Sequence, residues 1–174
     1  MEYIDLYKIE LCGCMTCLIC KQKNQDGCKC YWRDDLSPII ERIFDADALL
    51  VAAPIFFSAP TSHYMALLER LIYCMVSYEV GNAFKGKVNV GLFYSINYPK
   101  DYFEKSIRPH LKQSEEVLKM LNGEVCIYTA CNISKNERSK TSPEAQKKIA
   151  EKEKEFEKDL EEVFKIGAEL SSDN

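Results

Sequence analysis

Cysteine is the residue type in this sequence with the most chemistry to offer. The chain holds nine cysteines, and six of them fall within residues 12–30. Three follow one another with two intervening residues each, as Cys14, Cys17 and Cys20, and Cys28 comes after seven more residues. Thiolates at this spacing turn inward around one iron–sulfur cubane, and a fourth from a nearby turn completes the shell of four thiolates. The spacing makes these four cysteines candidate ligands of a [4Fe–4S] cluster.

Two other uses of the same loop stay open. Zinc also binds four cysteines, usually as two short pairs from separated knuckles, so the triplet favours a cluster over zinc. A reduced cysteine-rich loop without metal has about the same weight as the cluster, because spacing shows capacity and not occupancy. Cys74 ends a predicted helix and Cys126 lies in a predicted strand, so both are interpreted as small buried apolar residues. Cys131 is interpreted as unrelated to the loop.

A second candidate site ends the apolar run that begins near Ala48. Its residues are Pro54, Ile55, Phe56, Phe57 and Ser58. In open parallel sheets, ligands bind at the carboxyl ends of the strands. A proline-started aromatic turn at that edge can place backbone amides and ring faces against a planar cofactor. Taken alone, the same pattern is more often ordinary packing between a strand and a helix.

The other polar candidates have plainer interpretations. His63 and His110 have no partner at a recognisable spacing, so both are expected to be surface or helix-end histidines. Asp34 and Asp35 stand directly before a predicted helix, which favours a capping role over a carboxylate pair.

The elements that would position these residues alternate between strand and helix. Alternating residue types predict strands at 3–7, 88–95 and 125–129, and the apolar run 48–53 is typical of a strand covered by helices on both faces. Apolar residues at helical spacing predict helices at 36–44, 62–74 and 107–121, the last closing at Asn122 and Gly123, and a closing amphipathic helix within 135–170. This alternation predicts an α/β domain.

Length and composition limit the classes of protein. The chain of 174 residues is 47% apolar and carries a net charge of −4, so we expect one globular domain over residues 1–174 with a cysteine-rich loop at 12–30. The net charge predicts no general attraction to nucleic acid or to an anionic membrane. No apolar stretch reaches the roughly 18 residues of a membrane span, and no signal segment opens the sequence. We therefore expect a cytoplasmic protein with reduced thiols.

Several stretches together resemble a known family. They are the cysteine loop 14–30, the helix start Asp34-Asp35-Leu36, the segment Asp47 to Phe57, the run Met65 to Arg70, the segment Phe84 to Val88 and the closing Phe156 to Leu170. The pattern resembles the flavodoxin-like flavoproteins that include the NADPH-dependent FMN reductases and the iron–sulfur flavoproteins.

The resemblance implies a fold, a cofactor and an assembly. The fold would be a three-layer αβα sandwich around a parallel sheet of strand order 2-1-3-4-5, and the assembly a homodimer or homotetramer. FMN would lie at the carboxyl edge of the sheet, between the segment Pro54 to Ser58 and a second contact at Ser95, Ile96 and Asn97. If the cysteine loop holds a cluster, the family suggests electron transfer between cluster and flavin.

The sequence departs from the family pattern in two ways. Phe56, Met65 and Glu69 stand where the family usually has tyrosine, lysine and aspartate. The chain also begins at what looks like the second strand, so the first strand and its phosphate-binding loop are absent. We expect weaker FMN binding than in full-length relatives, or none. A truncation, an upstream start site and a strand supplied by another chain all stay open.

The leading hypothesis is an FMN-dependent oxidoreductase that takes electrons from NAD(P)H or a reduced carrier and passes them to an acceptor. Because the flavin does the chemistry, no side chain is expected to act as acid, base or nucleophile. The alternatives are an iron–sulfur flavoprotein electron carrier with FMN, a [4Fe–4S] cluster and a ferredoxin-type partner, or a truncated non-catalytic fragment.

Overall fold

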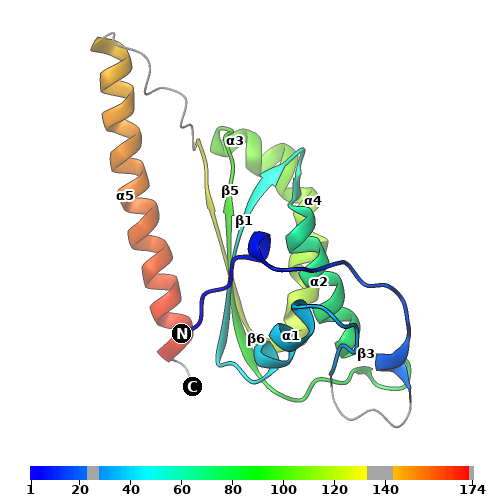
Figure 1. The fold of residues 1–174 in the computed structure, drawn as a ribbon. Coiled ribbons are helices and arrows are strands. Elements are labelled where there is room, and N and C mark those ends of the chain that lie inside the picture. The colour runs from blue at the N-terminus through cyan, green and yellow to red at the C-terminus, as the bar shows by residue number, and fades with distance from the viewer. Residues whose placement is uncertain (23–27, 133–142, 173–174) are drawn as a thin grey trace.

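Three parallel strands form the centre of the computed structural model, which describes residues 1–22, 28–132 and 143–172. They are β1 (Ala48–Phe56), β5 (Val88–Ser95) and β6 (Asn122–Ala130). The central strand β5 has a strand on either side, and its first five residues are buried because helices lie over both faces of the sheet there (Figure 1). The order β1-β5-β6 fits the 3-4-5 part of the expected sheet.

Helices cover the sheet from two sides, as Figure 1 shows. On one side lie α1 (Leu36–Phe44), α2 (Ser62–Met75) and α4 (Arg108–Glu116), and on the other lies the long helix α5 (Pro143–Ser172). The arrangement is consistent with the predicted flavodoxin-like αβα fold.

The predicted helix at 107–121 is α4 with short additions at both ends. Ahead of α4 come the short helix α3 (Lys100–Tyr102) and a π-helical turn at Phe103–Ile107, and a 3-10 turn at Val117–Leu121 follows it. Asn122 ends this run in the left-handed conformation with a φ of 61°, as predicted from the sequence.

Three very short strands were not predicted. Ala59–Pro60, labelled β2, pairs antiparallel with the end of β1. Val76–Ser77 (β3) and Gly81–Asn82 (β4) form a small hairpin after α2. Strands of two residues are too short to leave a periodic pattern in the sequence.

The prediction of a strand at residues 3–7 was wrong. The chain there is irregular and then forms a 3-10 turn at Leu6–Lys8, which Asp5 caps by accepting a hydrogen bond from the amide of Tyr7 at 3.0 Å. Alternation of residue types tells which faces a strand would show, but a strand also needs a neighbour. No strand of the described sheet other than β2 borders β1 on its outer side.

The prediction that helices cover both faces of β1 is only half right. Val51, Ala53 and Ile55 are buried in the hydrophobic core, whereas Leu50 on the opposite face is 46% exposed and Ala52 is also exposed. The described helix α5 lies over β5 and β6 more than over β1. One edge and half of one face of β1 are therefore open.

Asn89 on β5 and Tyr128 on β6 tie α5 to the sheet by hydrogen bonds. The buried side chain of Asn89 on β5 donates to the carbonyl of Leu170 at 3.0 Å and accepts from the amide of Glu124 at 3.0 Å. Farther along, the hydroxyl of Tyr128 donates to Asp159 at 2.6 Å.

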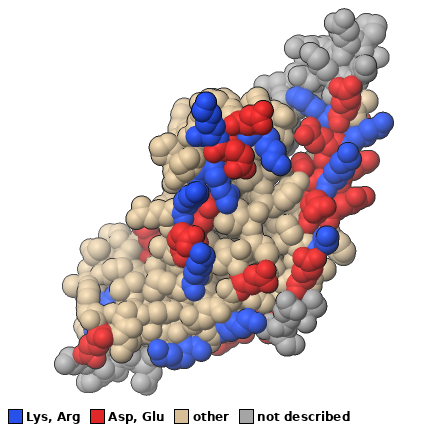
Figure 2. Space-filling view, turned by 180° about the vertical axis from the view of Figure 1, so that it is seen from behind, with Lys and Arg blue, Asp and Glu red and all other residues tan. Residues whose placement is uncertain are grey.

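On its outward side α5 carries interleaved acidic and basic residues without a patch of one sign, as Figure 2 shows. None of the described helices combines the length and apolar content that crossing a membrane requires.

Candidate functional site

The carboxyl edge of the sheet brings the two predicted cofactor-binding segments together. Pro54 stands opposite Ser95 in the parallel register of β1 and β5. Directly beyond, the amide of Ile96 donates to the carbonyl of Ala130 at 3.0 Å, which ties the loop after β5 to the end of β6. Segments 54–58 and 95–97 therefore lie side by side, at the place where parallel sheets bind ligands.

The turn after β1 has an unusual backbone. Phe57 and Ser58 both have positive φ values, 52° and 64°, and they join β1 to β2 as a two-residue hairpin loop. Such loops use the left-handed region at both positions, where asparagine, aspartate and glycine are preferred. A phenylalanine in this region is an uncommon and costly choice. Its presence points to a role for the ring rather than for the turn.

Aromatic rings stand exposed around this edge. Phe56 is 58% exposed and the side chain of Phe57 is fully exposed. Tyr98 in the loop after β5 stacks on Tyr102 at the end of α3 with ring centroids 5.0 Å apart, and each is about half exposed. Among the predicted residues, Ile55 and Ile96 are buried and contribute backbone only, whereas Asn97 is exposed.

These residues fit the ring system of FMN better than its phosphate. Flat exposed rings and a polar loop suit a planar, partly polar cofactor. None of the glycines that the structure describes lies at this edge, so no glycine-rich phosphate-binding loop is formed there by the described residues. The start of α2 is nearby, where Thr61 accepts from the amide of Tyr64 at 3.4 Å and caps the helix.

The cysteine-rich loop lies at the opposite end of α2. Lys21 anchors it there, because its ammonium group donates to the carbonyls of Tyr73 and Val76 and lies 4.3 Å from the centre of the Tyr73 ring. The amide of Cys14 donates to Glu69 at 3.2 Å. From Ser62 to Cys74 the helix rises about 18 Å, so α2 separates the cysteine loop from the carboxyl edge of the sheet.

Five cysteines line one narrow pocket at this end of the molecule. They are Cys14, Cys17, Cys20, Cys30 and Cys74, and the rest of the lining is mostly aromatic and apolar. Three of the four predicted ligands are therefore brought together, while Cys28 does not line the pocket. In the described part of the chain, no three histidine, cysteine or acidic side chains converge as a ready site for a metal ion. The donor type fits an iron–sulfur cluster, whose preferred ligands are thiolates.

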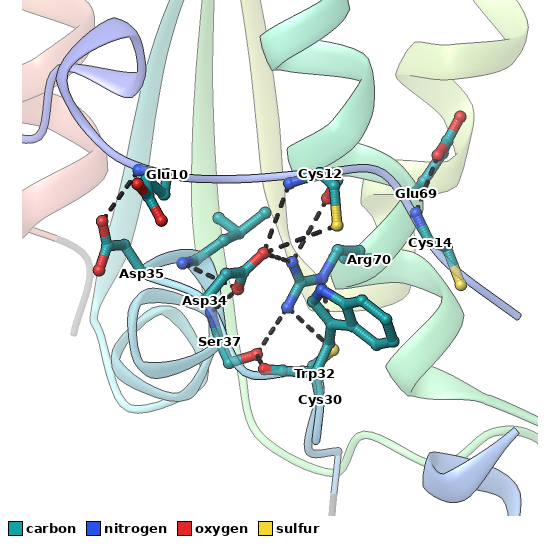
Figure 3. A network of polar contacts seen from close by, with 11 residues as sticks. Glu10, Cys12, Cys14, Cys30, Trp32, Asp34, Asp35, Ser37, Glu69 and Arg70 are labelled. Atoms are coloured by element: carbon teal, nitrogen blue, oxygen red, sulfur yellow. Dashed lines mark hydrogen bonds and ion pairs between the residues drawn. The ribbon is translucent and has the colours of Figure 1, made fainter. Parts of the chain in front are cut away.

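One buried arginine connects the cysteine loop to two helices (Figure 3). The Arg70 side chain is 1% exposed and forms an ion pair with Asp34. Its guanidinium also donates to the sulfur of Cys30 at 3.3 and 3.2 Å, to the hydroxyl of Ser37 at 2.6 Å and to the carbonyl of Cys12 at 3.3 Å. Arg70 thus holds both ends of the cysteine loop against α1 and α2.

Asp34 has two tasks in this network. It caps α1 as predicted, accepting from the amides of Leu36 and Ser37 at 3.2 Å each. It also faces Arg70, which the sequence pattern did not reveal. Burial alone would raise the pKa of Asp34, but the hydrogen bond and positive charge of Arg70 outweigh it and lower the pKa below its ordinary value.

The thiols of the pocket differ in acidity. A hydrogen bond from Cys74 lowers the pKa of Cys30 to about 5, against the opposing effect of burial, with help from the Trp32 amide and Arg70. The same contact and burial raise the pKa of Cys74. Burial raises the pKa of Cys20 and of Cys28, and the positive charge of Lys21 opposes this rise at both thiols. Other pocket cysteines add to the rise at Cys20. Cys30 is therefore the pocket's most acidic thiol among those with a shifted pKa.

The sequence signals missed two members of the pocket. Cys30 falls outside the regular spacing, and Cys74 is buried as predicted but has its thiol against Cys30. Arg70 looked like an ordinary helix residue. Its spacing of four after Ala66 on a buried helix face was the one available hint. His63 lies in the first turn of α2 and stacks on Tyr7 with the ring centroids 4.0 Å apart, and His110 is exposed on α4.

Comparison with known proteins places these features in a family. The sequence model described as NADPH-dependent FMN reductase matches residues 1–123. An iron–sulfur flavoprotein of Methanocaldococcus jannaschii is 28% identical over 90 residues, which is 52% of this chain and 45% of that protein. The matched stretch thus spans less than half the length of this curated relative. With the family model covering well over half of the chain, the chain belongs to the NADPH-dependent FMN reductase family.

Proposed function

We propose that this chain is an FMN-dependent oxidoreductase that moves electrons from NAD(P)H or a reduced carrier protein to an acceptor. The observation that carries the proposal is the meeting of segments 54–58 and 95–97 at the carboxyl edge, in a chain of this family. FMN supplies the redox chemistry when it is bound. The side chains at this edge then have to bind and orient the ring system and need not act as acid or base.

The rings of Phe56 and Phe57 are the residues best placed for that task. Both are exposed at the end of β1, and the backbone of the turn holds Phe57 away from the core. Ser95 and Asn97 on the neighbouring loop offer polar groups for the edge of the ring system. Because no described glycine loop serves the phosphate, we expect weak FMN binding.

The test is a titration of FMN with the purified chain, followed by its fluorescence. Wild-type protein is expected to quench the flavin at micromolar to millimolar concentrations. Replacing Phe57 with alanine removes the ring contact and should weaken binding about three- to tenfold, the value of one aromatic stacking interaction. Tyr78→Ala is the matched control, because Tyr78 is 78% exposed but lies at the other end of α2. A wild-type chain that quenches no flavin, or a Phe57 variant that binds as tightly as wild type, would contradict the proposal.

The electron donor is tested by anaerobic reduction of the flavin-loaded chain. Rapid reduction by NADPH or NADH supports a reductase. Slow reduction by both, with rapid reduction by a reduced ferredoxin, supports the second candidate, an iron–sulfur flavoprotein electron carrier.

The pocket lined by five cysteines is the observation that favours this second candidate. The name of the relative from Methanocaldococcus jannaschii is consistent with it. Iron, zinc and acid-labile sulfide measured on one anaerobic sample separate a cluster from zinc and from an empty loop. We propose in addition that the chain forms a homodimer or homotetramer, which sedimentation equilibrium would test.

A further inference from the structure

We propose that Tyr64, Tyr94 and Glu115 form a binding site for one buried water molecule, on the side of the sheet that α2 and α4 cover (Figure 1). None of the three residues belongs to the predicted flavin segments or to the cysteine loop. The site is therefore independent of the proposed function.

The three side chains are buried and come from separate elements. Tyr64 lies in the first turn of α2, Tyr94 near the end of β5 and Glu115 in the last turn of α4. Their exposed fractions are 3%, 2% and 5%. Within the described residues, the two tyrosine hydroxyls and Oε1 of Glu115 form no hydrogen bond. Since buried polar groups in folded proteins are almost always paired with protein or with ordered water, these three atoms require a partner.

The two hydroxyls and the carboxylate belong to one cluster. The rings of Tyr64 and Tyr94 meet edge to face, with their centroids 6.5 Å apart. Burial raises the pKa of Tyr64 to about 12, and the negative charge of Glu115 adds to the rise, whereas Tyr94 opposes it. Burial also raises the pKa of Tyr94, with contributions from Tyr64 and Glu115. The carboxylate thus acts on both hydroxyls, which requires the three groups to lie near one another.

Arg108 uses only part of the acceptor capacity of Glu115. Its Nη1 lies 3.1 Å from Oε1 of Glu115, in an ion pair without the geometry of a hydrogen bond. Burial raises the pKa of Glu115 against the opposing charge of Arg108. The other charges that act on Glu115 are those of Glu116, Lys112 and Glu104. Because a carboxylate offers about four lone-pair positions, it can accept a further hydrogen bond beside the arginine.

One water molecule can pair with all of these atoms at once. Its oxygen can accept from the hydroxyls of Tyr64 and Tyr94, and one of its hydrogens can be donated to Glu115. The other hydrogen can be donated to the hydroxyl oxygen of Ser114, which donates its own hydrogen to the carbonyl of Leu111 at 2.8 Å and also acts on Tyr94. Buried waters typically make about three hydrogen bonds, with a range of roughly two to four. The cluster therefore offers the number and kind of partners that a buried water needs.

A direct chain of hydrogen bonds is the competing arrangement. In that chain the hydroxyl of Tyr64 donates to the hydroxyl of Tyr94, which donates to Glu115. The described side chains form neither of these hydrogen bonds. The two arrangements differ in the number of water molecules held inside the protein, and this number can be measured.

The first experiment counts long-lived internal water by oxygen-17 relaxation dispersion, which exchanging hydroxyl protons do not affect. It compares wild type with the double variant Tyr64→Phe/Tyr94→Phe, which removes both donors to the water. The dispersion amplitude should fall by the contribution of about one water molecule. Tyr128→Phe is the matched control and should keep the wild-type amplitude, because the Tyr128 hydroxyl donates directly to Asp159 at 2.6 Å. An amplitude in the double variant as large as in wild type would overturn the water site in favour of the direct chain.

The second experiment measures the stability of the single variants Tyr64→Phe and Tyr94→Phe by urea denaturation. Loss of a hydrogen bond to the water should raise the unfolding equilibrium constant about two- to tenfold in each variant. Hydroxyls without any partner would give the opposite sign, because phenylalanine then removes a buried polar group that was unpaired. Variants more stable than wild type would therefore also overturn the water site. A cooperative urea transition shows that each variant, the double variant included, is folded when its water is counted.

Discussion

The side chain of Arg70 connects three segments of the chain. It binds Asp34 ahead of α1, Cys30 at the end of the cysteine loop and Cys12 at its start. With 1% of the side chain exposed, its charge is removed from water and depends on its partner. A buried ion pair adds little net stability by itself, but loss of one partner leaves an uncompensated charge.

Asp34→Asn should therefore lower the free energy of unfolding by about 3–5 kcal/mol, the cost of breaking a buried pair from one side. Urea denaturation followed by circular dichroism measures it. Asp35→Asn is the matched control, because Asp35 is exposed and, among the described residues, its side chain accepts from the amide of Glu10 at 2.9 Å. We expect the control to lose about 1 kcal/mol or less. Equal losses in the two variants would show that Arg70 is not tied to Asp34.

The same pair predicts a dependence on pH. The pKa of Asp34 is lower in the folded chain than in the unfolded chain, so its contribution to stability is fully present above the ordinary carboxyl pKa. That contribution is lost as pH falls through the folded pKa, which lies below the ordinary value. The difference in unfolding free energy between wild type and Asp34→Asn should be constant from about pH 5 to pH 7 and shrink below about pH 4. If the stability difference between wild type and Asp34→Asn grew as the pH falls, the pKa of Asp34 would be raised in the folded chain and not lowered.

Residue spacing predicted part of the site and tertiary contacts supplied the rest. The interval of two residues brought Cys14, Cys17 and Cys20 to one pocket, because the loop is short and local. Cys30 reaches the same pocket through Arg70, which lies 40 residues away in sequence. No local pattern can show such a contact.

At the scale of the elements, the beginning of β6 depends on a glycine. Asn122 ends the preceding helical run with a positive φ, and Gly123 follows directly against β5. A methyl group at Gly123 would overlap the carbonyl of Val88 and come within 2.7 Å of the amide nitrogen of Asn89. The sequence predicted the helix end at these residues, but only the register of β5 and β6 shows how closely the two backbones approach.

Gly123→Ala should accordingly lower the unfolding free energy by about 1–3 kcal/mol, the range for overpacked sites. Gly167→Ala serves as the comparison. On α5 the added methyl group would meet only Leu50 at an ordinary contact distance of 3.7 Å, so alanine should raise stability by up to about 1 kcal/mol through its better helix propensity. Thermal unfolding measures the change in stability of both variants. If Gly123→Ala were as stable as wild type, the close approach of the two backbones would be contradicted.

Most helices and the main strands were predictable because each buries a continuous apolar face. The helix α1 starts at Leu36 and β5 spans Val88–Ser95, as the periodicity indicated. The segment Tyr3–Tyr7 has an equally good alternation and yet forms no strand. Its pattern describes the segment alone, whereas a strand forms only where the fold places the segment alongside another strand.

For the molecule as a whole, the sheet is well covered at its central strand β5 and open along the outer edge of β1. The strand β5 is covered on both faces, but β1 leaves Leu50 and Ala52 exposed beside an outer edge that β2 borders only at its end. Unpaired edges with apolar side chains promote pairing with other chains. We therefore expect this edge to contribute to association with other chains.

Ala52→Lys places a charge on that edge and should reduce self-association at high protein concentration, because edge lysines oppose strand pairing. Sedimentation velocity over a concentration series measures the effect. Tyr78→Lys adds the same charge at an exposed turn away from the edge, so its sedimentation should match wild type. If both lysine variants behave alike, net charge and not the edge governs association.

The turn at Phe57 and Ser58 sets a limit on how this protein can be stabilised. The left-handed backbone conformation costs each residue about 1 kcal/mol of folding free energy, which glycine would avoid. The ring of Phe57 is fully exposed, so its packing adds no stability that offsets this cost. Selection for thermal stability alone would therefore replace Phe57 with glycine. Phe57→Gly should melt at a higher temperature than wild type and bind FMN less tightly. The two properties oppose each other at this one position, so a thermostable descendant of the chain would be a poorer flavoprotein.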